Sequence, residues 1–273
     1  MRARLVSFTV SFQDTRRMNE VLAVEGVTLA FGGVNALTGV DLSVPEGAIY
    51  GIIGPNGAGK TSLLNCIGGF YRPRVGSVRF LGRDVTRLSP DRRAAMGMAR
   101  TFQNIALFKG MTVLDNIKLG AHAHLGTNVF SALLYSPGAR REEASLREEV
   151  ENDVIDFLEI EHLRNRTVGG LSYGLQKRVE LGRALAMRPK VLLLDEPIAG
   201  MNQEETEDMA RFILDIKEER GVTLVMIEHH MGVVMDICDR VAVLNFGVKI
   251  TEGAPVEVKE NPEVVKAYLG KSH

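Results

Sequence analysis

Eight residues, GPNGAGKT from Gly54 to Thr61, have the types and spacing of a phosphate-binding loop. In the pattern G-x-x-x-x-G-K-[ST], backbone N–H groups cradle phosphates, a lysine reaches the β and γ oxygens, and a hydroxyl binds Mg²⁺. Lys60 and Thr61 supply the lysine and the hydroxyl, whereas a flexible glycine turn is the alternative interpretation. The candidate nucleotide-binding residues are Gly54, Pro55, Asn56, Gly57, Ala58, Gly59, Lys60, Thr61 and Ser62.

A second pair of candidate residues, Asp195 and Glu196, ends the apolar run in PKVLLLDEP. Such a run is typical of a buried parallel strand, and open α/β sheets bind ligands at the carboxyl ends of such strands. An aspartate there holds Mg²⁺, and an adjacent glutamate can accept a proton from attacking water. Because neighbouring residues of a strand point opposite ways, we assign metal binding to Asp195, together with Thr61, and the role of catalytic base to Glu196.

The elements that must position these residues are short β-type segments alternating with helices. The segments VLAVEGVTLAF, VNALTGVDLSV and AIYGIIG lead into the phosphate loop, and TSLLNCIGGF is predicted to be a helix that ends at Gly68 and Gly69. VGSVRFLGRDV, GVTLVMIEHH and DRVAVLNFG add strands, while NQEETEDMARFILDIKEER and MGVVMDIC add helices. This alternation predicts an α/β, doubly wound nucleotide-binding fold.

Residues 103–178 interrupt the alternation and are predicted to be a helical insertion. The segment 141–163 is expected to be a helix with a solvated acidic face. Its apolar residues at helical spacing are Leu146, Val150, Val154, Phe157 and Leu158. A second helix is expected from Leu175 to Met187, where Pro189 stops it.

The composition favours an ordinary globular protein with a large core, because 45% of the 273 residues are hydrophobic and 25% are charged. A net charge of -1 gives no electrostatic reason to expect wholesale binding to nucleic acid or to an anionic membrane. Cys66 and Cys238 lie among apolar neighbours, which favours buried thiols over a disulfide or a metal site. No apolar run is long enough for a membrane-spanning helix. No small-residue cleavage site supports a secretory signal, so residues 1–19 are predicted to be a disordered extension or an artefact of the start codon, since Met18 lies just before the first convincing strand.

The stretch LSYGLQKRVELGRALAMRPKVLLLDEP, residues 171–197, resembles the ATP-binding cassette family, in which an LSGGQ-like signature precedes the strand that carries the acids. The resemblance implies a P-loop NTPase (RecA-like) core, an antiparallel β subdomain and a helical insertion that carries the signature. Ser172 and Gly174 place a hydroxyl and a bare backbone at a helix N-terminus, which suits a γ-phosphate. The resemblance implies that ATP, with Mg²⁺, closes a dimer of two such subunits.

Three further residues take roles that the resemblance implies. Phe31 corresponds to the aromatic residue that stacks on adenine, and a core phenylalanine is the alternative. Gln103, in RTFQN, corresponds to the glutamine that senses Mg²⁺ and water, so it joins the metal and catalytic sets. His229, in MIEHH, corresponds to the histidine that contacts the γ-phosphate.

Four positions depart from the family pattern. Tyr173 and Leu175 replace a glycine and a glutamine of the signature, and the leucine removes a polar contact. Asn202, in AGMN, replaces a common aspartate and cannot be a charged partner across a dimer. His230 stands where an acid is frequent, and of the two histidines we favour His229 because it directly follows the glutamate that ends the strand.

A finer resemblance, to the ATP-binding subunits of high-affinity branched-chain amino acid importers, rests on MARTFQNIALFKGMTVLDNIKLGAH, SALLYSPGARREEA, DEPIAG and NPEVVKAYLG. It implies a single domain over 20–273, with core segments 20–102 and 179–250, a helical subdomain 103–178 and a helical tail 251–273. It also implies a peripheral position at the cytoplasmic face of the cell membrane. The implied partners are permease subunits, a second cassette ATPase and, indirectly, a solute-binding protein, with no nucleic acid. The apolar stretch Ile105 to Val113 is costly to expose in a free monomer, so the insertion is expected to face a membrane partner.

Other functions remain open at this point. A cassette ATPase of an exporter, such as lipopolysaccharide export, or of a urea or amide importer would share these motifs. Cassette ATPases of DNA repair or translation would need a long coiled coil or two cassettes in one chain, and neither pattern is present. A P-loop kinase would leave LSYGL and His229 unexplained. None of the residues identified would touch the transported molecule.

Overall fold

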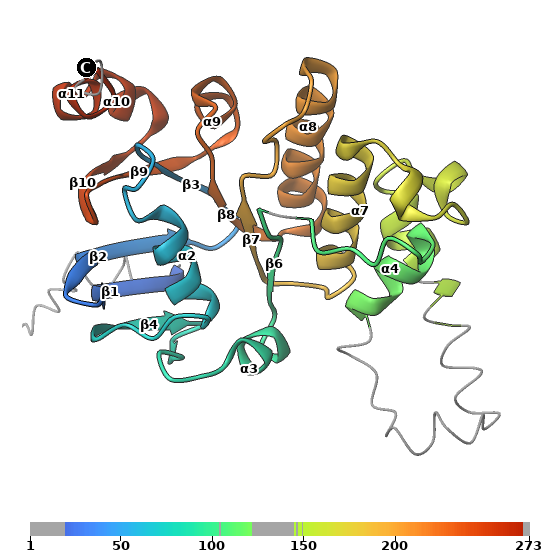
Figure 1. The fold of residues 1–273 in the computed structure, drawn as a ribbon, viewed down its shortest axis with the longest axis horizontal. Coiled ribbons are helices and arrows are strands. Elements are labelled where there is room, and N and C mark those ends of the chain that lie inside the picture. Colours follow the sequence, from blue (N-terminus) through green and yellow to red (C-terminus); the bar gives the residue numbers. More distant parts are fainter. Residues whose placement is uncertain (1–19, 104, 122–144, 146, 149, 270–273) are drawn as a thin grey trace, which may run out of the picture.

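The computed structural model describes residues 20–103, 105–121, 145, 147–148 and 150–269. The predicted extension 1–19 and the insertion segment SALLYSPGARREEA, residues 131–144, lie outside the described residues. Two sheets and a set of helices make up the described part, with the elements arranged as in Figure 1. The fold is α/β, as predicted.

The first sheet is antiparallel and comes from the N-terminal part of the chain. Its strands are β1 (Glu20–Phe31), β2 (Val34–Pro45), β4 (Val75–Phe80) and β5 (Arg83–Asp84). They are ordered β2-β1-β4-β5, with β1 pairing antiparallel to both β2 and β4. Along much of β2 buried and exposed residues alternate, which is the pattern of a sheet with one face on the core.

The second sheet carries the residues of interest at its strand ends. Its strands are β3 (Ile49–Ile53), β6 (Met98–Arg100), β7 (Val191–Asp195), β8 (Thr223–Ile227), β9 (Arg240–Asn245) and β10 (Val248–Gly253). The order is β10-β9-β3-β8-β7-β6, parallel except for the β9–β10 hairpin. Every residue of β3, β7 and β8 is buried. Both faces of these strands are therefore covered, which explains why their sequences are nearly continuous apolar runs.

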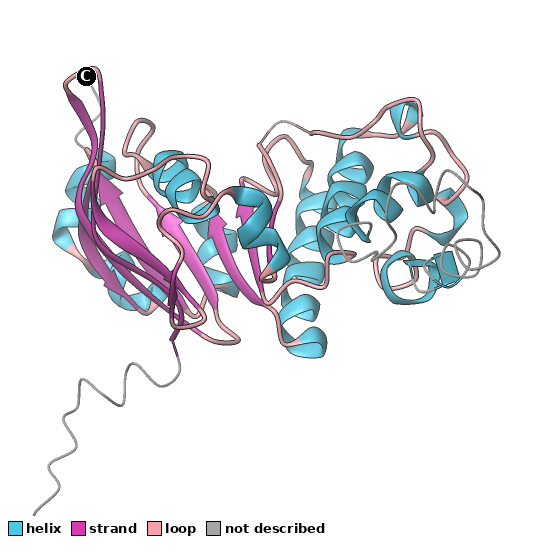
Figure 2. Cartoon of the chain, turned by 90° about the horizontal axis from the view of Figure 1, so that it is seen from below, coloured by secondary structure: helices cyan, strands magenta, loops and turns pink. Residues whose placement is uncertain are grey.

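Some helices connect the strands, and others form a largely helical part of the molecule. They are α2 (Lys60–Gly68), α3 (Pro90–Ala95), α4 (Val113–Ala121), α7 (Tyr173–Leu185), α8 (Gln203–Arg220), α9 (Met231–Ile237), α10 (Pro255–Glu260) and α11 (Pro262–Leu269). Figure 2 shows the strands in one half of the molecule and a largely helical part in the other. Close packing of α4 on α7 depends on Gly120, where a Cβ would collide with the carbonyl oxygen of Arg183.

The prediction of one long helix over 141–163 is wrong for its C-terminal end. The chain forms a π-helical turn, η2 (Glu151–Ile155), and then the short 3₁₀ turns η3 (Glu161–Leu163) and η4 (Val168–Gly170). The break falls at Glu159, whose φ of 56° is incompatible with a continuing right-handed helix. The apolar spacing is nevertheless correct where it is described, since Val150, Val154 and Leu158 are all buried.

Both cysteines are buried and free, as expected. Burial raises the pKa of the Cys66 thiol to about 11 and that of the Cys238 thiol to about 12. Both therefore stay protonated near neutral pH and behave as small apolar side chains.

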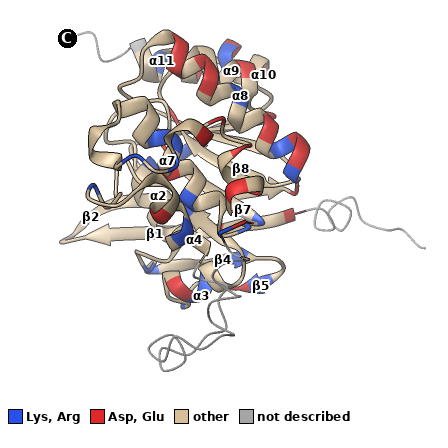
Figure 3. Cartoon of the chain, turned by 90° about the vertical axis from the view of Figure 1, so that its right-hand side faces the viewer, with Lys and Arg blue, Asp and Glu red and all other residues tan. Residues whose placement is uncertain are grey.

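In the cartoon of Figure 3, the positions of Lys and Arg are interspersed with those of Asp and Glu among the described residues. Among the same residues, no helix combines the length and apolar character needed to cross a membrane.

Candidate nucleotide site

The phosphate loop connects the end of β3 to the start of α2, and its glycines have backbone conformations that other residues rarely adopt. Gly54 has a φ of 149° and Gly59 a φ of 98°. A Cβ at Gly59 would lie 2.6 Å from the carbonyl oxygen of Ala36, and a Cβ at Gly54 would collide with that of Leu244. The bare loop therefore lets backbone N–H groups approach an anion closely, and the start of α2 adds its dipole.

Lys60, the first residue of α2, folds back into the loop and is only 7% exposed. Its Nζ donates to the carbonyl oxygens of Gly54, at 2.7 Å, and Pro55, at 3.2 Å. Neutral carbonyls are weaker acceptors for an ammonium group than phosphate oxygens. The loop carbonyls therefore hold the Lys60 ammonium group at the place where phosphate oxygens would replace them as acceptors.

A cavity of about 570 Å³ opens over this loop. It has the size of a small-molecule site, for which the usual range is about 300–1,000 Å³. Its lining residues are Val34, Asn35, Ala36, Asn56, Gly57, Ala58, Gly59, Lys60, Thr61, Ser62, Glu196, Phe246 and Gly247. The structure thus brings seven consecutive residues of the predicted set, Asn56 to Ser62, together with the predicted base, Glu196.

Asp195, the last residue of β7, is buried, with 2% of its side chain exposed. Its Oδ2 accepts a hydrogen bond from Arg100 Nη2 at 2.9 Å, whereas its Oδ1 has no partner. Burial raises the pKa of this carboxyl, and the hydrogen bond and positive charge of Arg100 partly offset that rise. An unpartnered carboxylate oxygen at the end of a central strand fits a Mg²⁺ ligand, as the sequence predicts.

Glu196 has a φ of 51°, which turns the chain sharply at the end of β7. Gln103 Nε2 donates to Glu196 Oε2 at 3.1 Å, and His229 Nδ1 lies 3.9 Å from Glu196 Oε1. The three predicted catalytic residues come from three segments and meet at one carboxylate. Their catalytic roles remain predictions.

Glu228 and His230 flank His229, and their contacts show which of the two histidines has its side chain near Glu196. Glu228 is fully buried and accepts hydrogen bonds from the backbone N–H groups of Ile198, at 3.0 Å, and His229, at 3.1 Å. Burial raises the pKa of Glu228. His230 Nδ1 instead accepts from Val233 N at 3.4 Å and caps α9. His230 is thus engaged as a cap, while 58% of the His229 side chain is exposed near Glu196.

Phe31 lies at the end of β1 and is 48% exposed. This exposure excludes the alternative of a core phenylalanine. Its ring packs edge-on against Tyr71, with centroids 5.2 Å apart and an interplanar angle of 75°. Phe31 does not line the cavity, so its contact with a base stays a prediction.

Ser172 and Gly174 begin α7, which Figure 1 shows on the far side of β6 and β7 from α2. Ser172 is the N-cap, and its Oγ accepts from Leu175 N at 3.3 Å. Neither Ser172 nor Gly174 lines the cavity over the phosphate loop. One chain therefore presents the two halves of the predicted ATP site on separate surfaces.

Glu205 joins the start of α7 to the start of α8. Its Oε2 accepts from Asn202 N at 3.2 Å, and its Oε1 accepts from Ser172 Oγ at 3.4 Å. Asn202 Oδ1 in turn accepts from Glu205 N at 2.9 Å, which completes a capping box on α8. A Cβ at Gly174 would displace the Glu205 carboxylate from this position.

Replacing Asn202 by alanine should destabilise the fold through this cap. We expect Asn202→Ala to lower the free energy of unfolding by about 1 kcal/mol, the usual cost of losing an N-cap side chain. Asn202→Asp is the matched control, because it keeps the cap and places a negative charge at a helix N-terminus. Urea denaturation measures both, and equal stability of the two variants would contradict the role of the cap.

Three residues of the site were missed by sequence reasoning: Arg100, Lys177 and Glu205. The N-x-x-E spacing of Asn202 and Glu205 is a readable capping signal. Arg100 is recognisable only in three dimensions, where its guanidinium lies 5.2 Å from the ring centroids of both Phe70 and Phe102, and those two rings pack edge-on against each other.

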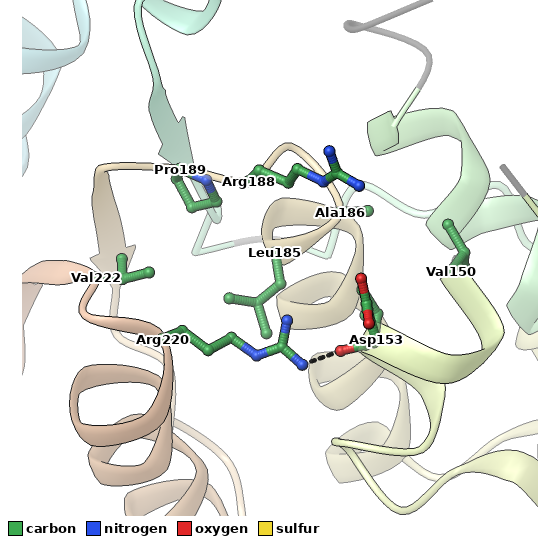
Figure 4. A pocket seen from close by; sticks show the side chains of 9 residues that line it. Val150, Asp153, Leu185, Ala186, Arg188, Pro189, Arg220 and Val222 are labelled. Carbon is green, nitrogen blue, oxygen red and sulfur yellow. Dashed lines mark hydrogen bonds between the residues drawn. The ribbon is translucent and has the colours of Figure 1, made fainter. Parts of the chain in front are cut away.

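A second cavity, of about 300 Å³, lies away from these residues (Figure 4). It lies between η2, the C-terminal end of α7 and the end of α8, where Arg220 donates to the Asp153 carbonyl oxygen. Its lining residues are Val150, Asp153, Val154, Leu185, Ala186, Arg188, Pro189, Arg220 and Val222. None of the predicted site residues is among them.

The fold and the loop geometry define an ATP-binding cassette, and the family model described as ABC transporter matches residues 37–199. The chain belongs to the ABC transporter family. Residues 248–273 also match the model described as branched-chain amino acid ATP-binding cassette transporter. The predicted P-loop NTPase fold with an antiparallel β subdomain is thereby confirmed, and the chain is an ATP-binding subunit of the ATPase class.

Individual relatives agree with this assignment. The chain is 41% identical to the high-affinity branched-chain amino acid transport ATP-binding protein BraF of Pseudomonas aeruginosa, and 38% identical to LivG of Escherichia coli. Each match covers 92% of this chain and 98% of the relative. A crystal structure of an ATP-binding cassette from an ABC transporter, in its ADP conformation, superposes with a TM-score of 0.80 at 37% identity, covering 92% of this chain and 99% of that one.

Proposed function

We propose that this chain hydrolyses ATP to drive an importer of branched-chain amino acids. The observation that carries the proposal is the meeting of Gln103, His229 and Glu196 beside the phosphate-loop cavity, in a chain 38–41% identical to BraF and LivG. The match of residues 248–273 to the branched-chain amino acid model supports this substrate class over urea or other amides, and over an exporter.

In the proposed reaction, the Glu196 carboxylate accepts a proton from the water that attacks the γ-phosphate. Gln103 holds Glu196 Oε2, and His229 stands near Oε1, so the carboxylate is oriented before substrate arrives. Lys60 and the N–H groups at the start of α2 stabilise the charge that develops on the phosphate oxygens. Phe31 stacks on the adenine.

The metal-ligand residues fit Mg²⁺. Asp195 Oδ1 is buried and has no hydrogen-bond partner among the described residues, which fits Mg²⁺, because proteins usually hold this ion through one or two carboxylates plus substrate phosphates. Asp195 and the Thr61 hydroxyl, with Gln103, would hold it, and the ion would neutralise charge on the β- and γ-phosphates.

Each site of the proposed assembly uses two cassettes. Because Ser172 and Gly174 lie away from the Lys60 cavity of their own chain, we place them against the γ-phosphate bound by a second cassette, identical or paralogous. An ATP-binding cassette solved as a dimer, 26% identical with a TM-score of 0.70, supports this arrangement. ATP then closes the pair, since the γ-phosphate contacts differ between the open and closed states.

The permease is proposed to dock on the surface that carries Phe70 and Phe102. A groove of about 240 Å³ there is lined by Phe70, Arg100 and Phe102, among others. Phe70, which lines this groove, is 48% exposed, and contiguous exposed apolar surface marks interaction sites. Phe108, in the apolar stretch Ile105 to Val113 of the insertion, is 58% exposed. Docking would place the chain peripherally at the cytoplasmic face of the membrane, with a solute-binding protein on the other side.

This arrangement divides the chain into the segments predicted from its resemblance. We propose core segments 20–102 and 179–250, a helical subdomain 103–178 and a helical tail 251–273 within one domain. The tail is supported by α10 and α11, which follow β10.

Capture and uptake test this function together. A tagged Glu196→Gln chain, trapped with Mg-ATP in its native membranes and gently solubilised, should retain two polytopic membrane subunits and a second cassette, identified by mass spectrometry. A strain lacking the chain should lose uptake of radiolabelled leucine, restored by the wild type but not by Glu196→Gln. Restored uptake of urea alone, or capture of soluble proteins only, would contradict the proposal.

A further inference from the structure

Lys177 is a buried cation in the middle of α7, with 4% of the residue exposed. Its Nζ donates to the backbone carbonyl oxygen of Gln103 at 3.2 Å and to that of Glu196 at 3.4 Å. Both acceptors belong to residues of the proposed hydrolytic cluster. The same helix begins at Ser172, which faces the other ATP site of the proposed dimer.

A lysine at this place is costly for folding. Burial lowers the pKa of Lys177, while the carboxylates of Glu180, Glu228, Asp195 and Glu196 oppose that shift. Burying a charge is expensive even when it is paired. Replacing a whole buried ion pair by apolar side chains is often neutral or stabilising, but removing Lys177 alone would leave the buried carboxylates around it uncompensated.

A second contact ties the same helix to the same catalytic segment. The ring of Tyr173 packs over Gly200, where a Cβ would lie 3.2 Å from Tyr173 Cε1. The Lys177 ammonium lies 5.9 Å from the centroid of that ring. Tyr173, which stands where the family has a glycine, thus connects α7 to Gly200 in the turn before α8, in addition to the contact between Lys177 and Glu196.

We propose that Lys177 is a positioning residue that couples the two ATP sites, by tying the helix that engages one ATP to the backbone of Gln103 and Glu196, which act on the other. The inference rests on the proposed dimer mechanism. When Ser172 engages a γ-phosphate, α7 and the two carbonyls it holds move as one body. Binding at one site thereby aligns the base at the other.

The test compares Lys177→Met with Lys177→Arg, using the full-length chain. Methionine keeps most of the volume and loses the charge, whereas arginine keeps the positive charge with a larger, planar head group. The matched control is Arg178→Met, the next residue of α7, because Arg178 binds Asp208 of α8 at 2.7 Å and contacts neither carbonyl. Thermal unfolding confirms that each variant is folded.

Turnover and ATP affinity are then measured separately. We expect Lys177→Met to lower kcat about tenfold or more, because misplacing a reacting group by an ångström can cost about a hundredfold. ATP affinity should stay within about twofold, since Lys177 touches no predicted phosphate ligand. The Hill coefficient for ATP should fall towards one, and Lys177→Arg should restore both the rate and the cooperativity.

A double mutant separates positioning from a general structural role. In single-turnover measurements, Lys177→Met added to Glu196→Gln should cause little further loss, because both changes disable the same base. Multiplied losses, an unchanged kcat or Hill coefficient in Lys177→Met, or an equal fall in Arg178→Met would each overturn the inference. If the wild-type chain itself showed no ATP turnover, the proposed function would fail before this comparison.

Discussion

Glu196→Gln should bind Mg-ATP with nearly wild-type affinity while its turnover falls by about a hundredfold or more, the usual contribution of a general base. The amide keeps the shape of the side chain and its contact with Gln103 but cannot accept a proton. Measuring kcat by phosphate release and Kd by equilibrium binding separates the two effects.

Glu204→Gln is the matched control for this prediction. It makes the same chemical change on the exposed face of α8, in the first turn and away from the cavity. Its turnover should match the wild type. Unchanged turnover in Glu196→Gln would remove Glu196 as the base and transfer attention to His229.

Lys60→Ala should fail at the earlier step, nucleotide binding. A hydrogen bond to a charged group contributes about 1.5–3 kcal/mol, so losing this one should weaken ATP affinity by about tenfold to a hundredfold. The change also leaves the carbonyl oxygens of Gly54 and Pro55 without the donor that holds the loop.

Isothermal titration with Mg-ATP measures the loss, with Lys190→Ala, an exposed lysine outside the site, as the control. AMP tests whether the loss comes from the missing contact to the β- and γ-phosphates. Because AMP lacks these phosphates, it should bind the wild type and Lys60→Ala with equal affinity. Tight ATP binding by Lys60→Ala would show that the phosphates bind elsewhere.

Local signals in the sequence predicted the parts of the site that lie within one segment. The phosphate loop between β3 and α2, and the acids at the end of β7, need only the spacing of neighbouring residues. The same holds for the end of α2, where Gly69 adopts the expected left-handed conformation with a φ of 84°.

Contacts between segments could not be predicted in this way. Strand β6 has three residues and is defined by its pairing with β7, so periodicity gave no signal for it. Arg100 stands at its end and reaches Asp195, which is far away in the sequence. Likewise, a lysine in an amphipathic helix normally suggests a solvated face, whereas Lys177 is buried by packing between α7 and the segments that contain Gln103 and Glu196.

The positive φ of Glu196 has a consequence for how such a chain can be engineered. Glycine adopts this conformation without penalty, whereas other residues held in left-handed or sparsely populated regions cost about 1–3 kcal/mol. Phe246, with a φ of 45°, lines the same cavity, so two non-glycine residues in unfavourable conformations flank the ATP site. A laboratory selection for thermal resistance alone would favour glycine at position 196, which, with Glu196 as the proposed base, would yield a more stable protein without turnover. Any stability screen of this chain must therefore be paired with a screen for turnover.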